Sequence, residues 1–152
     1  MYIAAQADYA MCALIALAAS PTDRPVKADD VAKAQDLPVG FLENILGRLR
    51  RGGFVRSVRG SEGGYRLARP PSEITVADVI RALEGPLAEV RGLRPEALSY
   101  QAPAEHLQDV WIATRSALRM VLEKVTLANI IDGKLPAGVR KLAADPDAWL
   151  PH

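Results

Sequence analysis

Residues 48–69 carry most of the cationic chemistry of this chain and read RLRRGGFVRSVRGSEGGYRLAR. Seven arginines stand there against a single acidic residue, Glu62, whereas the whole chain of 152 residues has a net charge of only +1. Guanidinium groups bind phosphate oxygens, and a dense, ordered set of them is typical of proteins that contact the DNA backbone. The segment therefore predicts a nucleic-acid partner, double-stranded DNA.

The shape expected for this segment is a helix that leads into a two-stranded β-ribbon. Apolar residues of the stretch 41–51 share one helical face, and Gly52-Gly53 follow it. Two short β-prone runs, 54–58 and 65–67, flank a glycine-rich tip at 60–64. An arginine precedes that tip, so the ribbon would carry positive charge at its far end.

Two further helices are expected before the basic segment. Apolar spacing predicts one over residues 6–19, and Asp29 and Asp30 lie where negative charge favours the start of another. Pro38 has the backbone geometry that suits the opening of the next helix. Two short helices joined by a tight turn and followed by a ribbon are typical of a winged helix-turn-helix. We expect a mainly α fold with a DNA-binding domain over residues 1–85.

Thr75 and Asp78 form a capping-box pattern that opens the last helix of this domain. The part of the chain that follows is expected to carry the dimerisation helix. We expect a linker loop over 86–103, a long helix and a short terminal helix over 104–133, and an irregular tail over 134–152. The long helix needs a partner for its apolar stripe, either the first helix of its own chain or a second chain. The stripe positions are Leu107, Val110, Trp111, Leu118, Val121 and Leu122.

The composition is that of a small globular protein. The chain is 49% apolar and 24% charged, which argues against global disorder. No stretch approaches about 18 consecutive apolar residues, so we expect no membrane partner and a cytoplasmic location. The single cysteine, Cys12, excludes an internal disulfide. No catalytic triad, phosphate loop or metal-ligand spacing is present, and the chain is not expected to be an enzyme.

The run from Val55 to Val90, VRSVRGSEGGYRLARPPSEITVADVIRALEGPLAEV, resembles the Rrf2 family of bacterial winged-helix transcription regulators. Tyr9-Ala10 and the later VTLANII run (Val125–Ile131) match the same pattern. The resemblance covers about residues 1–132, and the wing motif R-G-x-x-G-G-Y is its most specific part. It implies a homodimeric regulator, which we expect to be a repressor, whose long helices cross and whose two wings address a near-palindromic operator.

The resemblance also implies roles for particular positions. The recognition helix would be Val39–Arg50, in which Glu43 would accept from a cytosine amino group and Asn44 would pair with adenine. Arg59 matches the wing-tip arginine that enters the minor groove, where narrow A·T tracts attract guanidinium groups. The expected DNA contacts are Val39, Gly40, Phe41, Glu43, Asn44, Arg48, Arg50, Arg56, Arg59, Gly60, Gly63 and Gly64.

Two groups within this set have distinct expected roles. Arg48, Arg50 and Arg56 are expected to contact DNA phosphates, which positions the protein without reading the base sequence. Gly60, Gly63 and Gly64 are expected to adopt positive φ angles and to allow a close approach to the DNA backbone.

The largest departure from the family concerns sensing. Iron–sulfur members hold a cluster with three cysteines in the loop before the long helix, whereas residues 86–106 contain none here. The positions expected for the three cysteines and a nearby histidine hold Gly92, Leu98, Glu105 and Gln108. Because a cluster needs several thiolate or imidazole ligands, no cofactor is expected. Any signal would be a small-molecule effector, a partner protein or oxidation of Cys12.

Two other functions remain open at this point. The near-neutral total charge, together with Gln6, Asp8 and Phe41 at positions where the family commonly has other residues, favours a winged-helix interaction module without DNA binding. A redox- or metal-responsive variant would use Asp8 and Cys12, one helical turn apart, with His106 of a second chain.

Overall fold

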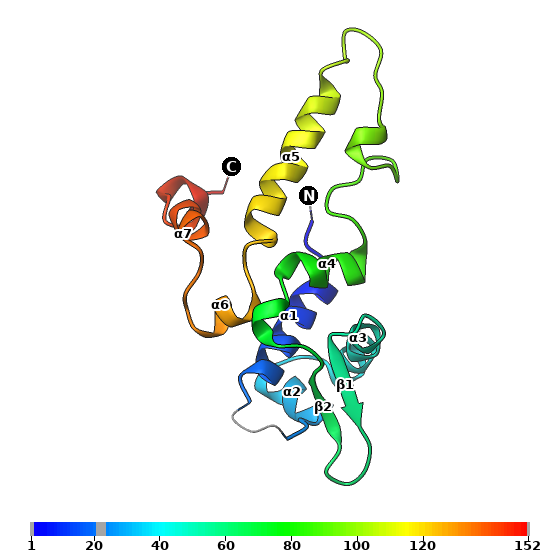
Figure 1. Ribbon diagram of the computed structural model, residues 1–152, viewed down its shortest axis with the longest axis vertical. Helices are drawn as coiled ribbons and strands as arrows, with labels where there is room; N and C mark the ends of the chain where they lie inside the picture. Colours follow the sequence, from blue (N-terminus) through cyan, green and yellow to red (C-terminus); the bar gives the residue numbers. More distant parts are fainter. Residues whose placement is uncertain (1, 21–23, 152) are drawn as a thin grey trace.

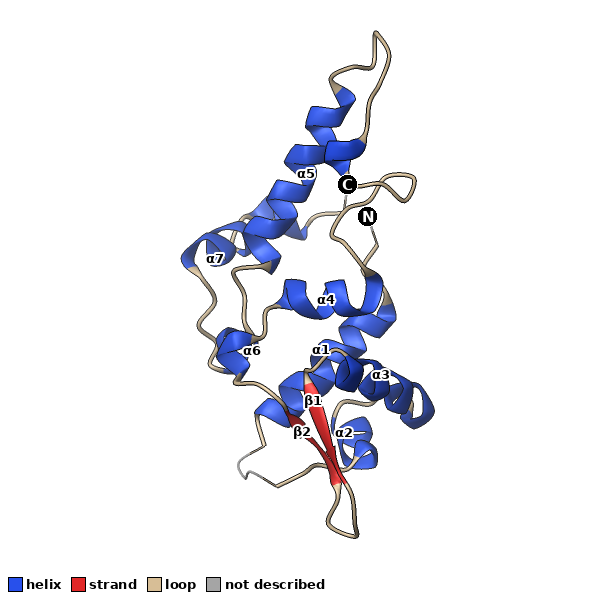
Figure 2. Cartoon of the chain, turned by 45° about the vertical axis from the view of Figure 1, so that its right-hand side comes forward, coloured by secondary structure: helices blue, strands red, loops and turns tan. Residues whose placement is uncertain are grey.

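The computed structural model describes residues 2–20 and 24–151 and shows a helical chain with one two-stranded sheet (Figures 1 and 2). Its helices are α1 (Ala5–Ala18), α2 (Ala28–Ala34), α3 (Val39–Arg51), α4 (Val76–Glu84), α5 (Leu107–Leu122), α6 (Leu127–Ile131) and α7 (Ala137–Ala143). Its strands are β1 (Val55–Val58) and β2 (Gly64–Leu67), and short 3-10 turns are η1 (Pro71–Glu73), η2 (Pro95–Ala97) and η3 (Pro146–Trp149). The predicted winged helix-turn-helix is confirmed. None of the described helices combines the length and apolar character that a membrane span needs.

The core is built around α1, against which α3, α4 and α6 pack. Three small or medium side chains of α1, Ala10, Ala13 and Leu14, are completely buried, so the neighbouring helices approach it closely. The apolar stripe of α3 meets it with Leu46 and Leu49, which are also completely buried. Burying each such leucine contributes about 1.5–3 kcal/mol relative to an exposed position. The core therefore fixes α3 by one face and leaves the opposite face in solvent.

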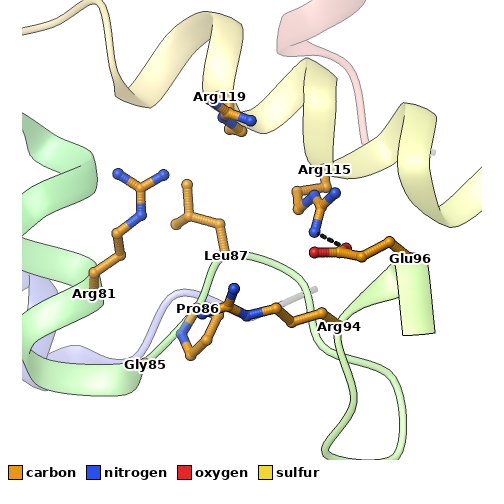
Figure 3. Close-up of a pocket in the computed structure, with 8 residues that line it drawn as sticks. All are labelled: Arg81, Gly85, Pro86, Leu87, Arg94, Glu96, Arg115 and Arg119. Carbon is orange, nitrogen blue, oxygen red and sulfur yellow. Dashed lines mark hydrogen bonds and ion pairs between the residues drawn. The ribbon is translucent and has the colours of Figure 1, made fainter. Parts of the chain in front are cut away.

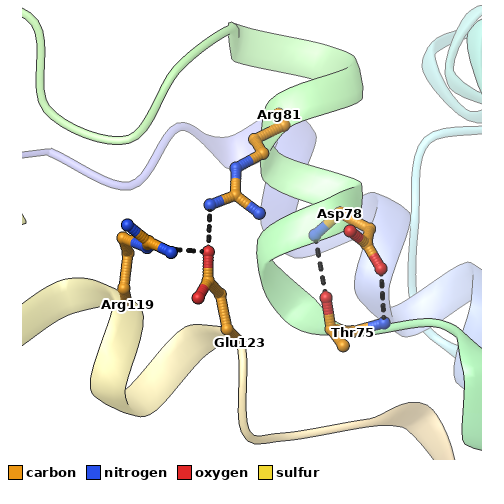
Figure 4. A network of polar contacts seen from close by, with 5 residues as sticks. All are labelled: Thr75, Asp78, Arg81, Arg119 and Glu123. Atoms are coloured by element: carbon orange, nitrogen blue, oxygen red, sulfur yellow. Dashed lines mark hydrogen bonds and ion pairs between the residues drawn. The ribbon is translucent and has the colours of Figure 1, made fainter. Parts of the chain in front are cut away.

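Two capping boxes bring the chain back to this core after α5. At the start of α4 the Thr75 hydroxyl accepts from the Asp78 N–H, and the Asp78 carboxylate accepts from the Thr75 N–H, both at 3.1 Å (Figure 4). Thr126 and Asn129 repeat the arrangement at the start of α6. The two boxes lie side by side, because the Leu127 N–H donates to the Ile74 carbonyl at 3.0 Å. The chain that follows α5 is thus anchored to the winged helix through α6.

The tail contains a helix that the sequence prediction missed. Residues 134–152 were expected to be irregular because of their three prolines, yet α7 and η3 lie within them. Pro136 precedes α7, where its fixed φ costs nothing, and the helix itself is rich in strong helix formers. The Trp149 indole then donates to the carbonyl of Ala143 at 2.7 Å, which caps the helix end.

Candidate nucleic-acid interface

The outward face of α3 carries two glycines, so the backbone of the helix is accessible along part of this face. Gly40, Asn44, Gly47 and Arg51 follow one another at spacings of four, three and four residues, so they form one line along the helix. This line lies opposite the buried side, whose members are Leu42, Ile45, Leu46 and Leu49. A Cβ atom added at Gly40 would meet nothing within 4 Å, and one at Gly47 only the Arg51 guanidinium at 3.9 Å. The folded chain therefore leaves room here for another molecule.

The two flanks of α3 are held by different neighbours. On one side the Phe41 ring packs edge-on against Tyr9 of α1, with 5.6 Å between the ring centroids. On the other side Arg50 donates to the hydroxyl of Ser57 in β1 at 3.3 Å. The helix α3 therefore lies between α1 and the wing. Arg50 is exposed at the junction of α3 and the wing, where one bound molecule could contact both elements.

Arg48 differs from its expected role. Its guanidinium donates to the side-chain oxygen of Gln6 at 2.5 Å and to the main-chain carbonyl of Leu83, and the residue is only half exposed. Carbonyls at the end of a helix attract cations, since the helix dipole is negative there. Arg48 thus joins α3 to α1 and to the end of α4, which positions the recognition helix but occupies the group assigned to phosphate. Arg51, exposed on the outward line, offers a free guanidinium instead.

The wing projects away from the helices as an antiparallel ribbon (Figure 1). Val26 adds one further bridge, because it exchanges two hydrogen bonds of 2.8 Å with Tyr65 of β2. Within the ribbon Arg56 and Arg66 are direct cross-strand partners, and like charges so placed are destabilising. Contact with an anionic surface would remove that cost. Arg59 is exposed at the start of the tip, as expected.

Three glycines shape the wing for different reasons. Gly60 has φ +110°, in the region that only glycine adopts easily, and its carbonyl accepts from the Gly63 N–H at 3.0 Å. Gly63 was expected to share a positive φ and does not, yet a Cβ atom there would fall onto the carbonyl of Val58. A Cβ atom at Gly64 would lie 2.5 Å from the carbonyl oxygen of Val26. Gly60 and Gly63 thus allow the tight turn at the wing tip, and Gly64 allows Val26 to approach β2 closely enough to pair with Tyr65.

The structure distinguishes arginines of the basic segment that pack against the domain from side chains that lie on the outward face of α3. Arg69 lies against the Phe54 ring at 4.7 Å from its centroid, so it packs against the domain, as Arg48 also does. Gly47 and Arg51 were not among the expected contacts, although a glycine in the middle of a helix is a usable signal. Glycine there destabilises a helix by about 0.5–1 kcal/mol relative to alanine, and no described neighbour of Gly47 requires it.

Replacing Gly47 with alanine should therefore stabilise the protein by about 0.5–1 kcal/mol while weakening its binding to DNA. The added methyl group fits the free protein but would stand between the helix and a groove. Chemical unfolding and DNA titration of the same preparation measure both effects. Gly138→Ala in α7, which also meets nothing within 4 Å, is the matched control for binding. A more stable Gly47→Ala protein that binds DNA as tightly as before would exclude this line from the interface.

The chain matches the model of the Rrf2 family, described as an iron-dependent transcriptional regulator, over residues 3–133. It belongs to the Rrf2 family. One relative, the HTH-type transcriptional regulator CymR of Bacillus subtilis, is 35% identical over 140 residues, which cover 90% of this chain and 96% of CymR. Rv1287 of Mycobacterium tuberculosis, also named as an HTH-type regulator, is 48% identical over 145 residues, 95% of this chain and 90% of its own.

Solved structures agree with this assignment. The structure of CymR, the global cysteine regulator of B. subtilis, superposes with a TM-score of 0.74 at 32% sequence identity, and the match covers 88% of this chain and 98% of CymR. A transcriptional regulator of Listeria innocua superposes with a TM-score of 0.77 at 29% sequence identity. The match covers 100% of this chain and 96% of the Listeria chain. This Rrf2 protein is thus a DNA-binding transcriptional regulator with the winged fold of its relatives.

The residues of this Rrf2 chain do not fit an iron–sulfur cluster, although the family description names iron. The sequence holds one cysteine, and within residues 2–20 and 24–151 no group of three or more His, Cys, Asp or Glu side chains is arranged to hold a metal ion. Cluster ligation needs several thiolate or imidazole donors. The chain is a family member that lacks the cluster cysteines.

Cys12 should react slowly with alkylating reagents while the protein is folded. Its half-burial, and next the negative charge of Asp8, raise the pKa of the Cys12 thiol, so less of the reactive thiolate is present near neutral pH. We expect iodoacetamide at pH 8 to modify the native protein several-fold more slowly than the same protein in urea. Mass spectrometry over time measures both rates, with Cys12→Ser as the blank. An equal or faster native rate would instead favour the redox-responsive hypothesis.

Proposed function

We propose that this Rrf2 protein is a dimeric repressor that binds a near-palindromic operator. Each subunit places α3 in a major groove and Arg59 in the flanking minor groove, with half-sites about 34 Å apart, one turn of DNA. The observation that carries this proposal is the hydrogen bond from Arg50 to Ser57, which ties one flank of α3 to the wing while the outward face of the helix stays open. Helix and wing then address DNA as one unit, with Glu43 and Asn44 toward the base edges.

The case for a dimer rests on α5. None of its residues is buried, and it exposes Val110 by 52% and Met120 by 66%. An amphipathic helix that remains open in one chain is stabilised when a second copy covers it. The expected apolar stripe of α5 divides into two parts. One part contacts its own chain: Trp111 donates to the Tyr100 hydroxyl at 3.0 Å, and Leu118, Val121 and Leu122 are half-buried. The other part, Leu107 and Val110, remains exposed. We assign the exposed part to the partner subunit.

Sequencing the genomic fragments that the purified protein retains tests the proposed operator. Fragmented DNA from the host is captured at 50 and at 200 mM salt, and we expect one near-palindromic motif that is lost at the higher concentration. The recovered site is then placed before a reporter gene, whose expression should fall when the protein is supplied. No enriched motif from a folded dimer would favour an interaction module, and a rise in reporter expression would overturn the repressor assignment.

A further inference from the structure

A cavity of about 440 Å³ lies between the end of α4, the loop that follows it and α5 (Figure 3). Guanidinium groups from all three segments surround it, and its lining is Arg81, Gly85, Pro86, Leu87, Arg94, Glu96, Arg115 and Arg119. Four arginines and one glutamate therefore share one small space. The volume is that of a cavity for a small molecule.

The carboxylates around this cavity do not balance its cations. Arg115 pairs with Glu96 (Figure 3), and Glu123 pairs with both Arg81 and Arg119, with 3.0 Å between Glu123 and Arg119 (Figure 4). Arg94, which is exposed, makes no ion pair with any residue that the structure describes. Four cations against two carboxylates leave a surplus of two positive charges.

Protonation does not remove either carboxylate at neutral pH. A main-chain hydrogen bond and then Arg115 lower the pKa of Glu96, and hydrogen bonds from Arg81 and Arg119 lower the pKa of Glu123. Both groups therefore stay ionised, and the surplus positive charge belongs to the arginines alone. The two carboxylates neutralise only part of the charge of the four guanidinium groups, so a further anion would be attracted to the surplus.

These arginines are not part of the surface that faces DNA. The cavity lies beside α5 and the loop after α4, whereas the wing tip lies at the opposite end of the molecule (Figure 1). DNA phosphates held by α3 and the wing do not neutralise it. Arginine presents its donors as a planar fork that matches a carboxylate or a phosphate group.

We propose that this cavity binds a small dianionic molecule, one that carries two carboxylates or a phosphate group. Arg94 supplies the unpaired guanidinium, and Arg115 and Arg119 extend the cationic wall from α5. The bound anion contacts Gly85, Pro86 and Leu87, which directly follow the end of α4.

The same segment reaches the recognition helix. The carbonyl of Leu83, which lies in the sequence between the lining residues Arg81 and Gly85, accepts from Arg48 of α3. A ligand that shifts the end of α4 therefore acts on the residue that positions α3. This regulatory step rests on the proposed repressor function, whereas ligand binding does not. Coupling between two sites of one protein typically changes the affinity of one ligand by about 5- to 150-fold, and we expect a change of that size in the affinity for DNA.

Nuclear magnetic resonance of the arginine Nε–H groups in the whole chain of 152 residues tests the binding step. Inorganic phosphate and succinate are titrated separately at constant ionic strength, and we expect saturable shifts of the Arg94 and Arg115 signals. Arg94→Ala removes a cation without breaking an ion pair, and it should weaken binding by about tenfold or more. Arg140→Ala, an exposed position of α7 with the same loss of charge, should leave the dissociation constant unchanged.

Shifts that never saturate with either probe, or that Arg94→Ala and Arg140→Ala alter equally, would overturn the cavity as a binding site. The regulatory step is read separately, as the affinity for the recovered operator with and without the probe that saturates. An unchanged DNA affinity would remove the coupling and leave the anion site standing. Absence of DNA binding in any condition would overturn the repressor proposal alone, since the resonance titration contains no DNA.

Discussion

Raising the salt concentration from 50 to 200 mM should weaken operator binding by about 10³- to 10⁵-fold, as for proteins that neutralise roughly 6–10 phosphates. Four exposed arginines in each subunit, Arg50, Arg51, Arg56 and Arg59, lie on α3 or the wing. A dimer presents two such sets, and backbone N–H groups add further contacts. Each neutralised phosphate releases condensed counterions, and added salt reduces that entropy gain.

Fluorescence anisotropy of a labelled operator duplex over a series of salt concentrations gives the slope of log affinity against log salt. Arg51→Ala should make that slope shallower by about one for each subunit. Arg48→Ala should change the slope little, since its guanidinium is held by Gln6 and Leu83, although the loss of those contacts would destabilise the fold. A slope near zero for the unchanged protein would contradict phosphate contact and favour the interaction module.

Arg59→Ala should lower operator affinity by about 1.5–3 kcal/mol for each subunit, which is roughly 10- to 100-fold. Its side chain is exposed beside a tip that Gly60 and Gly63 turn tightly, so nothing in the described structure holds it back from DNA. The narrow minor groove of A·T tracts has a strongly negative potential, and the loss should therefore be largest on sites with A·T-rich flanks.

Two duplexes that differ only in their flanks, one rich in A·T and one rich in G·C, measure this preference. Arg59→Lys keeps the charge but loses the planar fork, so it should retain part of the affinity. Arg140→Ala removes the same charge from α7 and should bind both duplexes as before. If Arg59→Ala binds both duplexes as tightly as the unchanged protein, the wing does not enter the minor groove.

The sequence by itself determined the local elements of the winged helix and their order. The predicted recognition helix, Val39–Arg50, differs from α3 by one residue, and the capping box at Thr75 forms as expected. These features depend on neighbours within a few residues: the apolar period of a helix, the hydrogen bonds of its first turn, and the glycines of a tight turn. The wing motif, being equally local, was enough to indicate the family.

Only the tertiary structure decided which side chains are free to act. Arg48 and Arg51 look alike in the sequence, but contacts with Gln6 and Leu83, 42 and 35 residues away, hold one and leave the other open. The stripe of α5 divides between its own chain and solvent for the same reason, and the arginine cavity gathers cations from three segments. A periodic pattern shows which residues share a face, whereas the partner of that face is set by packing between segments far apart in the chain.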